Sequence, residues 1–170
     1  MTDSITPFTR APSILTTQAK NHVGKASEPI GFLCFTLDNE EFGVDLQLVC
    51  QVVKPPPVTW VPRIPERYLG VISIRGAVVT LIDLRQLMGR KPTAWPKGGR
   101  VLIVETEDEQ IGLLVDSVTQ VRRFLVKDLE KKPNLREEKG CDHLVCIARS
   151  EDAHPVMIVD LDAVLQEKLK

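Results

Sequence analysis

Residues 43–52 read GVDLQLVCQV, and a similar pattern, GLLVDSVTQV, stands at residues 112–121. The two segments share the initial glycine, two aliphatic positions, a valine and the closing Gln-Val. Later in each half a short apolar run ends in Asp-Leu, at residues 81–84 and again at 158–161. We interpret these pairs as an internal duplication of a small β-rich unit. The alternative is chance similarity of apolar strands, which the repeated glycine, glutamine and aspartate disfavour.

Short apolar runs bounded by turn residues predict strands around these segments. The runs occupy residues 31–37, 42–44, 68–75 and 77–82 in the first half and 101–104 and 111–115 in the second. About five short strands per half are too few for a two-layered sandwich, and closing them into a barrel removes the exposed strand edges. The pattern therefore predicts an all-β chain of two small barrels packed together.

Two helices and one helical turn are expected besides the strands; the turn begins at its cap, Asp83, and ends at Gly89. Asp45 caps a predicted helix over residues 46–53, which the three prolines at 55–57 must end. This helix carries apolar side chains on two faces, so either a partner or the core between the halves covers the second face. Asp160 caps the other helix, over residues 160–169, whose apolar stripe consists of Leu161, Val164, Leu165 and Leu169.

The chain divides into a tail and one globular part. Residues 1–28 are rich in Ser, Thr and Pro without a sustained period, which is typical of a flexible tail. Residues 29–169 form the predicted globular part. Its first half spans about 30–93 and its second about 100–159, and the helix at 160–169 closes it.

Charge and hydropathy exclude several classes of function. The 170 residues include 22 Lys or Arg and 23 Asp or Glu, which gives a formal net charge of −1. Such a chain is poorly suited to neutralising a phosphate backbone, so no nucleic-acid partner is expected. No apolar run approaches the roughly 20 residues that span a bilayer, and no secretory signal is evident. We expect a cytoplasmic protein without direct membrane insertion.

The sequence carries no phosphate-binding, dinucleotide-binding, metalloprotease or nucleophile-elbow motif. Cys34 and Cys50 stand in apolar runs, where a free thiol behaves as a small hydrophobe. Cys141 and Cys146 flank His143, but no second cluster completes a zinc site. Reduced thiols, no metal and no cofactor are therefore expected. The sequence predicts a binding module rather than an enzyme.

Two further stretches carry a resemblance to a known family. Residues 41–52 read EFGVDLQLVCQV, and residues 70–85 read GVISIRGAVVTLIDLR. Together with GLLVDSV at 112–118 and the C-terminal helix, they resemble the CheW family of chemotaxis coupling proteins over about residues 30–169. The resemblance implies two intertwined SH3-like five-stranded β-barrels with short helices and a C-terminal helix.

The resemblance also implies a function and its partners. It implies a non-enzymatic adaptor that couples the cytoplasmic tips of methyl-accepting chemoreceptors to the regulatory domain of the histidine kinase CheA. The adaptor would lie in the cytoplasm, at membrane-associated receptor arrays. Receptor contact in the family falls in the groove between the barrels, at positions that match Val49, Gly70, Arg75, Val101, Gly112 and Val118, with Gln51 as a further contact. Kinase contact uses a barrel end, for which the resemblance assigns no residues.

Arg75 is the lone charge between Gly70 and Asp83. Strand alternation places it on the face of Val71 and Ser73, away from the inward isoleucines. An arginine in this position is either a solvated rim residue or a bidentate anchor for a partner carboxylate.

The chain departs from the resemblance at three positions. The family commonly has Glu, Asn and Pro where this chain has Gln51, Ser73 and Thr80. These departures leave open a paralogue that serves a non-flagellar chemosensory array. The alternative function is a free-standing regulatory or ligand-sensing barrel domain.

Overall fold

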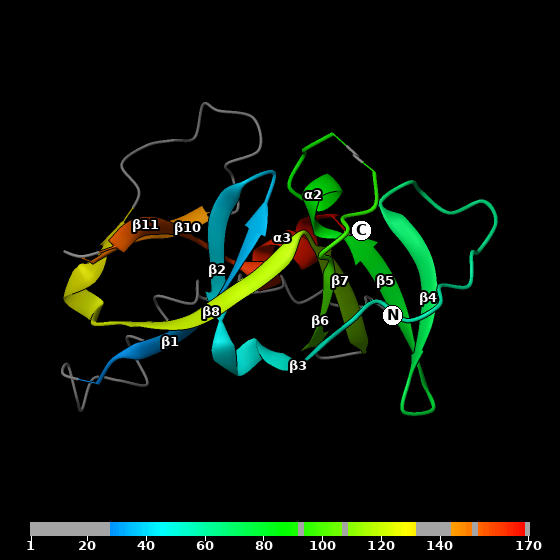
Figure 1. Ribbon diagram of the computed structural model, residues 1–170, viewed down its shortest axis with the longest axis horizontal. Helices are drawn as coiled ribbons and strands as arrows, with labels where there is room; N and C mark the ends of the chain where they lie inside the picture. Colours follow the sequence, from blue (N-terminus) through cyan, green and yellow to red (C-terminus); the bar gives the residue numbers. More distant parts are fainter. Residues whose placement is uncertain (1–27, 92–93, 107–108, 132–143, 151–152, 169–170) are drawn as a thin grey trace, which may run out of the picture.

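The computed structural model describes residues 28–91, 94–106, 109–131, 144–150 and 153–168 (Figure 1). Residues 1–27 of the expected tail, together with Cys141, His143 and Leu169, lie outside these ranges.

Eleven strands of the described chain form two sheets. Sheet one has the order β8-β1-β2-β11-β10-β9 and consists of β1 (Ile30–Leu37), β2 (Glu40–Asp45), β8 (Ser117–Phe124), β9 (Leu129–Lys131), β10 (Leu144–Ser150) and β11 (Ala153–Val159). Sheet two has the order β3-β6-β7-β5-β4 and consists of β3 (Val49–Val53), β4 (Tyr68–Ile74), β5 (Ala77–Asp83), β6 (Arg100–Glu105) and β7 (Gln110–Val115). The predicted all-β class is confirmed, with five strands in one sheet and six in the other.

The two sheets exchange strands along the chain. Strands β1 and β2 pair within sheet one with strands that follow residue 116, whereas β6 and β7 complete sheet two beside β3, β4 and β5. The short helices are η1 (Leu46–Leu48), α2 (Leu84–Leu87), η2 (Val126–Asp128) and α3 (Leu161–Lys168). Figure 1 shows the sheets side by side, with α2 and α3 between them.

The duplicated segments occupy matching places in the two sheets. In sheet one, β11 runs parallel to β2 and sets Ile158 opposite Gly43. In sheet two, β5 runs parallel to β7 and sets Leu81 opposite Gly112. The sequence aligned Gly43 with Gly112 and Leu81 with Ile158, so each sheet contains the same pairing of one repeated glycine position with one repeated aliphatic position. Both glycines are close-packed, since a Cβ would stand 2.9 Å from Cδ1 of Ile158 at Gly43 and 3.0 Å from Cγ1 of Val101 at Gly112.

Strand alternation distributes the core into three clusters, because both faces of the central strands are buried. On β1, Phe32 and Cys34 point into a cluster within sheet one, whereas Leu33 and Phe35 point into a central cluster between the sheets. On β6, Val101 lies in a cluster within sheet two. The helices α2 and α3 also contribute to the central cluster, through Leu84, Leu87, Leu161, Val164 and Leu165.

Residues 46–53 do not form the expected helix. Only η1 is helical, and the side chain of Asp45 accepts a hydrogen bond at 2.9 Å from the backbone N–H of Gln47. The chain then becomes β3, because β-branched valines favour an extended backbone and β6 offers an edge on which to pair. The other capping predictions are confirmed: Asp83 caps α2, and Asp160 accepts from the N–H of Ala163 at 3.0 Å.

Candidate functional site

A β-bulge decides which way the side chains of β3 point. Val49 pairs with Val104 and Gln51 pairs with Ile103, so Cys50 is an extra residue in β3. Cross-strand partners share a face, so Val49 lies with Val104 on the central cluster. Gln51 lies on the opposite side, with Ile103 and the interior of sheet two. The bulge therefore separates two predicted receptor contacts that are only two residues apart.

Strand β8 presents apolar side chains to the same central cluster. Val118 pairs with Phe35, and Val121 pairs with Leu33; both partners belong to the central cluster. Val118 is half-buried against this cluster, whereas Val121 is 47% exposed. Strand β8 is an edge strand of sheet one, as β3 is of sheet two.

Two edge segments thus leave apolar side chains partly uncovered beside the central cluster. We call the set the inter-sheet surface; its members are Leu46, Leu48, Val49, Val52, Val118 and Val121. Leu48, Val49 and Val118 are half-buried, and the other three are exposed. An apolar surface built from both sheets is typical of a protein-binding site.

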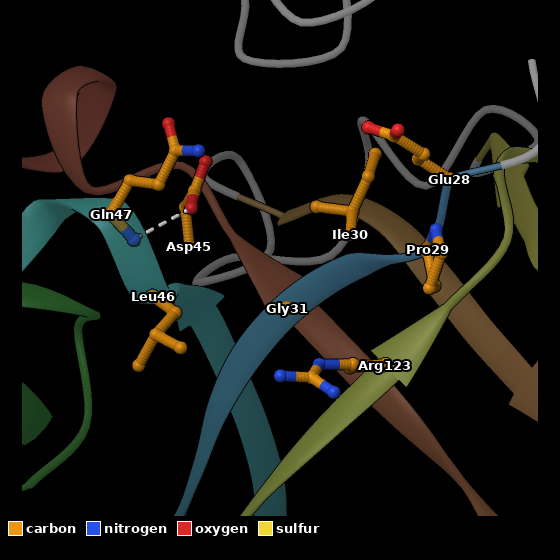
Figure 2. Close-up of a pocket in the computed structure, with 8 residues that line it drawn as sticks. All are labelled: Glu28, Pro29, Ile30, Gly31, Asp45, Leu46, Gln47 and Arg123. Carbon is orange, nitrogen blue, oxygen red and sulfur yellow. Dashed lines mark hydrogen bonds between the residues drawn. The ribbon is translucent and has the colours of Figure 1, made fainter. Parts of the chain in front are cut away.

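An open pocket of about 360 Å³ lies at one end of the inter-sheet surface (Figure 2). Leu46 lies over Gly31, where an added Cβ would stand 3.4 Å from Cδ2 of Leu46. Figure 2 shows Leu46 and Asp45 on one side of β1 and Arg123 on the other, with Glu28 near the start of the strand. The pocket holds charges of both signs.

Val101 and Gly112, two predicted receptor positions, come together inside sheet two. Val101 is fully buried, and it pairs with Val53 of β3. Both residues are buried, so neither presents a side chain at the surface. Their packing supports β3, which carries Val49.

Gly70 allows another part of the chain to approach β4. Its φ is +132°, and an added Cβ would stand 2.3 Å from the carbonyl oxygen of Thr59. Thr59 and Val71 exchange two backbone hydrogen bonds, at 2.8 and 2.9 Å. Gly70 therefore permits the segment before β4 to cover the edge of sheet two.

Arg75 lies in a turn rather than on a strand face, which corrects the expected alternation. Strand β4 ends at Ile74, and Arg75 and Gly76 form a two-residue hairpin turn with φ of +50° and +86°. The side chain is exposed and makes no hydrogen bond or ion pair with any residue in the described part of the chain. A positive φ is uncommon for a residue other than glycine, asparagine or aspartate, so this arginine stands where the backbone favours other residues.

The cysteines and the candidate metal ligands are the remaining reactive side chains of the described residues. No group of three or more His, Cys, Asp or Glu side chains is placed to hold a metal ion in the ranges that the structure describes. Burial raises the pKa of the Cys34 and Cys146 thiols to about 11, which makes them poor nucleophiles. Cys34, Cys50 and Cys146 are free thiols.

Comparison with known proteins assigns the chain to a family. A family model described as the CheW-like domain matches residues 31–169. The chain belongs to the CheW family. Proteins of this family are non-enzymatic scaffolds of chemotaxis signalling, which couple chemoreceptors to CheA.

Named relatives agree with this assignment. The chain is 31% identical over 134 residues to the chemotaxis protein CheW of Helicobacter pylori, covering 74% of this chain and 81% of that protein. It is 30% identical over 139 residues to the probable CheW of Rhizobium etli, covering 79% and 86%. The crystal structure of the scaffolding protein TtCheW from Thermoanaerobacter tengcongensis superposes with a TM-score of 0.74 at 29% identity, covering 84% and 97%.

Within this CheW-like fold, reasoning from the sequence missed part of the inter-sheet surface. The apolar side chains of the predicted helix over residues 46–53 include Leu46, Leu48 and Val52, and no prediction concerned Val121 as a contact. The alternation of β8 against β1 was the signal for Val121, because Leu33 and its partner share a face.

Among the described residues, no helix is long and apolar enough to cross a bilayer.

Proposed function

We propose that this chain couples the cytoplasmic tips of chemoreceptors to the regulatory domain of CheA at receptor arrays, through two separate surfaces. The inter-sheet surface is the observation that carries the proposal. It is apolar, partly uncovered and built from both sheets, so a partner that binds there contacts the whole fold rather than one barrel.

The inter-sheet surface suits a helical partner. A helix presents apolar side chains at i, i+3, i+4 and i+7, and it buries them against a surface such as Val49, Val118 and Val121. The tip of the β4–β5 hairpin, with Arg75, projects to the same side of the molecule in Figure 1 as β3. We therefore assign the receptor tip to this side, with Arg75 as a peripheral anchor for a carboxylate.

The other predicted receptor positions act on this surface through the fold. Gly70, Val101 and Gly112 shape sheet two and β3 without offering a side chain to the partner. Gln51 is half-buried on the inner side of β3, so its effect on the receptor passes through the strand.

A second partner needs a second surface. The most exposed large apolar side chains in the described chain are Val78, at 75%, and Trp60, at 71%. Val78 lies on β5 opposite Ser73, and Trp60 directly follows Thr59, which pairs with β4. Both therefore belong to the outer β4–β5 side of sheet two, and we assign the kinase regulatory domain to them.

Two variants test the assignment of the two partners to two separate surfaces. Val121→Asp introduces a charge on the inter-sheet surface, and Val78→Asp introduces one on the outer hairpin. Affinities are measured for a receptor signalling-tip fragment and for the isolated CheA regulatory domain. We expect Val121→Asp to weaken receptor binding by more than tenfold with kinase binding intact, and Val78→Asp to do the reverse.

Gln120→Asp is the matched control, since Gln120 is an exposed β8 residue outside the inter-sheet surface and its side chain makes no hydrogen bond or ion pair with the described residues. It should leave both affinities within about twofold. Receptor binding that survives Val121→Asp in a folded protein contradicts the assignment of the inter-sheet surface.

A further inference from the structure

Two arginines lie at the junction of the two sheets, on α2 and just after it. Helix α2 begins directly after β5 of sheet two, and its Leu84 and Leu87 are buried in the central cluster. Arg85 lies on the helix, and the backbone N–H of Arg90 donates to the carbonyl oxygen of Arg85 at 2.9 Å. The two side chains therefore leave one short, rigid segment.

Arg85 contacts Asp116, the residue at which the chain passes from sheet two to sheet one. Its Nε and Nη2 donate to the two carboxylate oxygens of Asp83 at 3.0 and 2.8 Å, and both side chains are 3% exposed. Its Nη1 lies 3.4 Å from Oδ1 of Asp116, the residue between β7 and β8. The hydrogen bonds to Asp83 raise the pKa of Arg85 despite its burial, so the charge is permanent.

Asp116 is held in turn by sheet one. Its backbone N–H donates to the carbonyl oxygen of Thr36 at 3.1 Å, and its Oδ2 accepts from the backbone N–H of Asp38 at 2.7 Å. Thr36 belongs to β1, and Asp38 follows the end of this strand. Arg85 thus reaches sheet one through a single carboxylate.

Arg90 contacts the β1–β2 hairpin directly. Its Nη1 donates to Oδ2 of Asp38 at 3.2 Å, its Nη2 donates to Glu40, and its guanidinium lies over the ring of Phe42 at 5.1 Å. Burial lowers the pKa of Arg90, but the hydrogen bonds to Glu40 and Asp38 outweigh it and the net shift is upward. Figure 1 shows α2 beside the tip of this hairpin.

We propose that Arg85 and Arg90 form an ionic clamp that fixes the relative orientation of the two sheets and thereby sets the spacing of the inter-sheet surface. In Figure 1, α2 lies at the upper end of the junction between the two sheets and β3 lies at its lower end. A rotation about the central cluster, once the clamp is released, therefore separates β3 from β8. Both arginines are positioning residues, since neither contacts the proposed receptor site.

The effect of the clamp on the orientation of the sheets is measured as the distance between a label on β3 and a label on β8. Spin labels are attached at Cys50 on β3 and at Gln120→Cys on β8, both exposed, in a Cys141→Ser background. Double electron–electron resonance then gives the distribution of distances between the labels. We expect a narrow distribution in the parent protein and one at least twofold wider in Arg90→Met.

Arg149→Met is the matched control, because Arg149 also forms an ion pair, with Glu130 at 2.8 Å, but within sheet one. It should leave the distribution unchanged. An unchanged width in Arg90→Met overturns the clamp, whatever the receptor does. If Arg90→Met fails to fold, raising the salt to about 1 M on the parent protein weakens the half-exposed Arg90 pairs, because the screening length falls to about 3 Å. An unchanged width there has the same meaning.

The positioning role rests on the proposed function and has its own readout. Arg90→Met should weaken binding of the receptor-tip fragment by about tenfold, and Arg149→Met should not. A wider distance distribution with unchanged receptor affinity overturns the positioning role and leaves the clamp standing. Loss of receptor binding in the parent protein is instead a failure of the proposed function.

Discussion

The β1–β2 and β4–β5 hairpins turn through the same two-residue geometry, with φ of +50° and +68° at Asp38 and Asn39 and of +50° and +86° at Arg75 and Gly76. The first turn is tied into the molecule, since Asp38 binds Asp116 through its backbone and Arg90 through its side chain. The second turn projects from sheet two, and its arginine has no partner in the described chain. The two turns therefore have the same backbone conformation but different surroundings. The first hairpin contacts other parts of the fold, whereas the tip of the second is exposed and accessible to a partner.

The difference also appears in the residue types. Asp and Asn tolerate the left-handed region, so the first turn has the residues that its backbone favours. Arginine does not, and strained residues of this kind cluster at sites of function. The second turn thus keeps an unfavourable residue whose side chain makes no hydrogen bond or ion pair within the described ranges. The following predictions test this contrast, from the largest effect to the smallest.

Removing the support of the first hairpin should cost the most stability. Arg85→Met leaves the buried carboxylate of Asp83 without its bidentate partner and removes the guanidinium that lies 3.4 Å from Asp116. Breaking a buried pair from one side costs about 3–5 kcal/mol. Urea unfolding of Arg85→Met should show this loss, while Arg75→Met should change the free energy of unfolding by less than about 0.5 kcal/mol. Equal losses in the two variants would remove the contrast.

The edge of the second hairpin depends on Gly70. Gly70→Ala places a Cβ 2.3 Å from the Thr59 carbonyl at a φ that alanine avoids. The backbone must shift, so we expect a loss of about 3 kcal/mol in the free energy of unfolding. Gly31→Ala is the matched control on β1, because its Cβ meets only Leu46, at an ordinary 3.4 Å. A Gly70→Ala protein as stable as Gly31→Ala would show that Thr59 does not need to lie so close.

The cores behind the two hairpins should differ in their response to alkali. The cluster within sheet one contains Cys34 and Cys146, whereas the described cluster within sheet two contains no cysteine. Burial, and for Cys34 also the charge of Glu41, raises each pKa to about 11, against about 8.5 in an unfolded chain.

The sign of the effect follows from the direction of these shifts. Because the unfolded thiols ionise first, stability is fully present below pH 8.5 and falls as the pH rises toward 11. We expect a loss of about 1–3 kcal/mol per thiol over this window, measured by urea unfolding at successive pH values. Cys34→Ala with Cys146→Ala should remove the slope, and a slope that persists assigns it to other groups.

Much of this organisation follows from local sequence. The repeat found in the sequence predicted that Gly43 and Gly112 stand in equivalent places, and the two parallel strand pairs confirm it. Asp83 and Asp160 were predictable as caps because a cap needs only its own following residues. The resemblance to the CheW family predicted both the fold class and the family, and both predictions are confirmed.

The rest depends on contacts between distant segments. The apolar run at 46–53 fits a buried helix or a strand, and only its pairing with β6 decides between them. The bulge at Cys50, which turns Gln51 away from Val49, has no local signal in the sequence. Strand alternation placed Arg75 on a strand face because the hairpin turn begins one residue earlier than the glycine suggests. The clamp joins residues that are far apart in the chain, so periodicity does not reveal it.

The smallest effect on stability should accompany a clear effect on binding, at Arg75. Arg75→Ala removes an exposed side chain that has no hydrogen bond or ion pair to the described part of the chain, so the melting temperature should hardly change. Interface arginines contribute about 2 kcal/mol or more when the planar guanidinium pairs with a carboxylate, so receptor binding should weaken by more than tenfold. Kinase binding, assigned to Val78 and Trp60, should persist. The measurements are thermal unfolding and the two affinities.

A second substitution separates the side chain from the backbone of this turn. Arg75→Asn removes the guanidinium but supplies a residue that favours a positive φ, so it should raise stability slightly while weakening receptor binding as much as the alanine variant does. If the turn geometry alone mattered to the receptor, the asparagine variant would bind normally and the alanine variant would not. If Arg75 were held between the barrels, both variants would melt early and lose both partners together. A stable Arg75→Ala protein with unchanged receptor affinity would show that the Arg75 side chain is exposed but does not contribute to receptor binding. The proposed difference in role between the two hairpins would then be wrong.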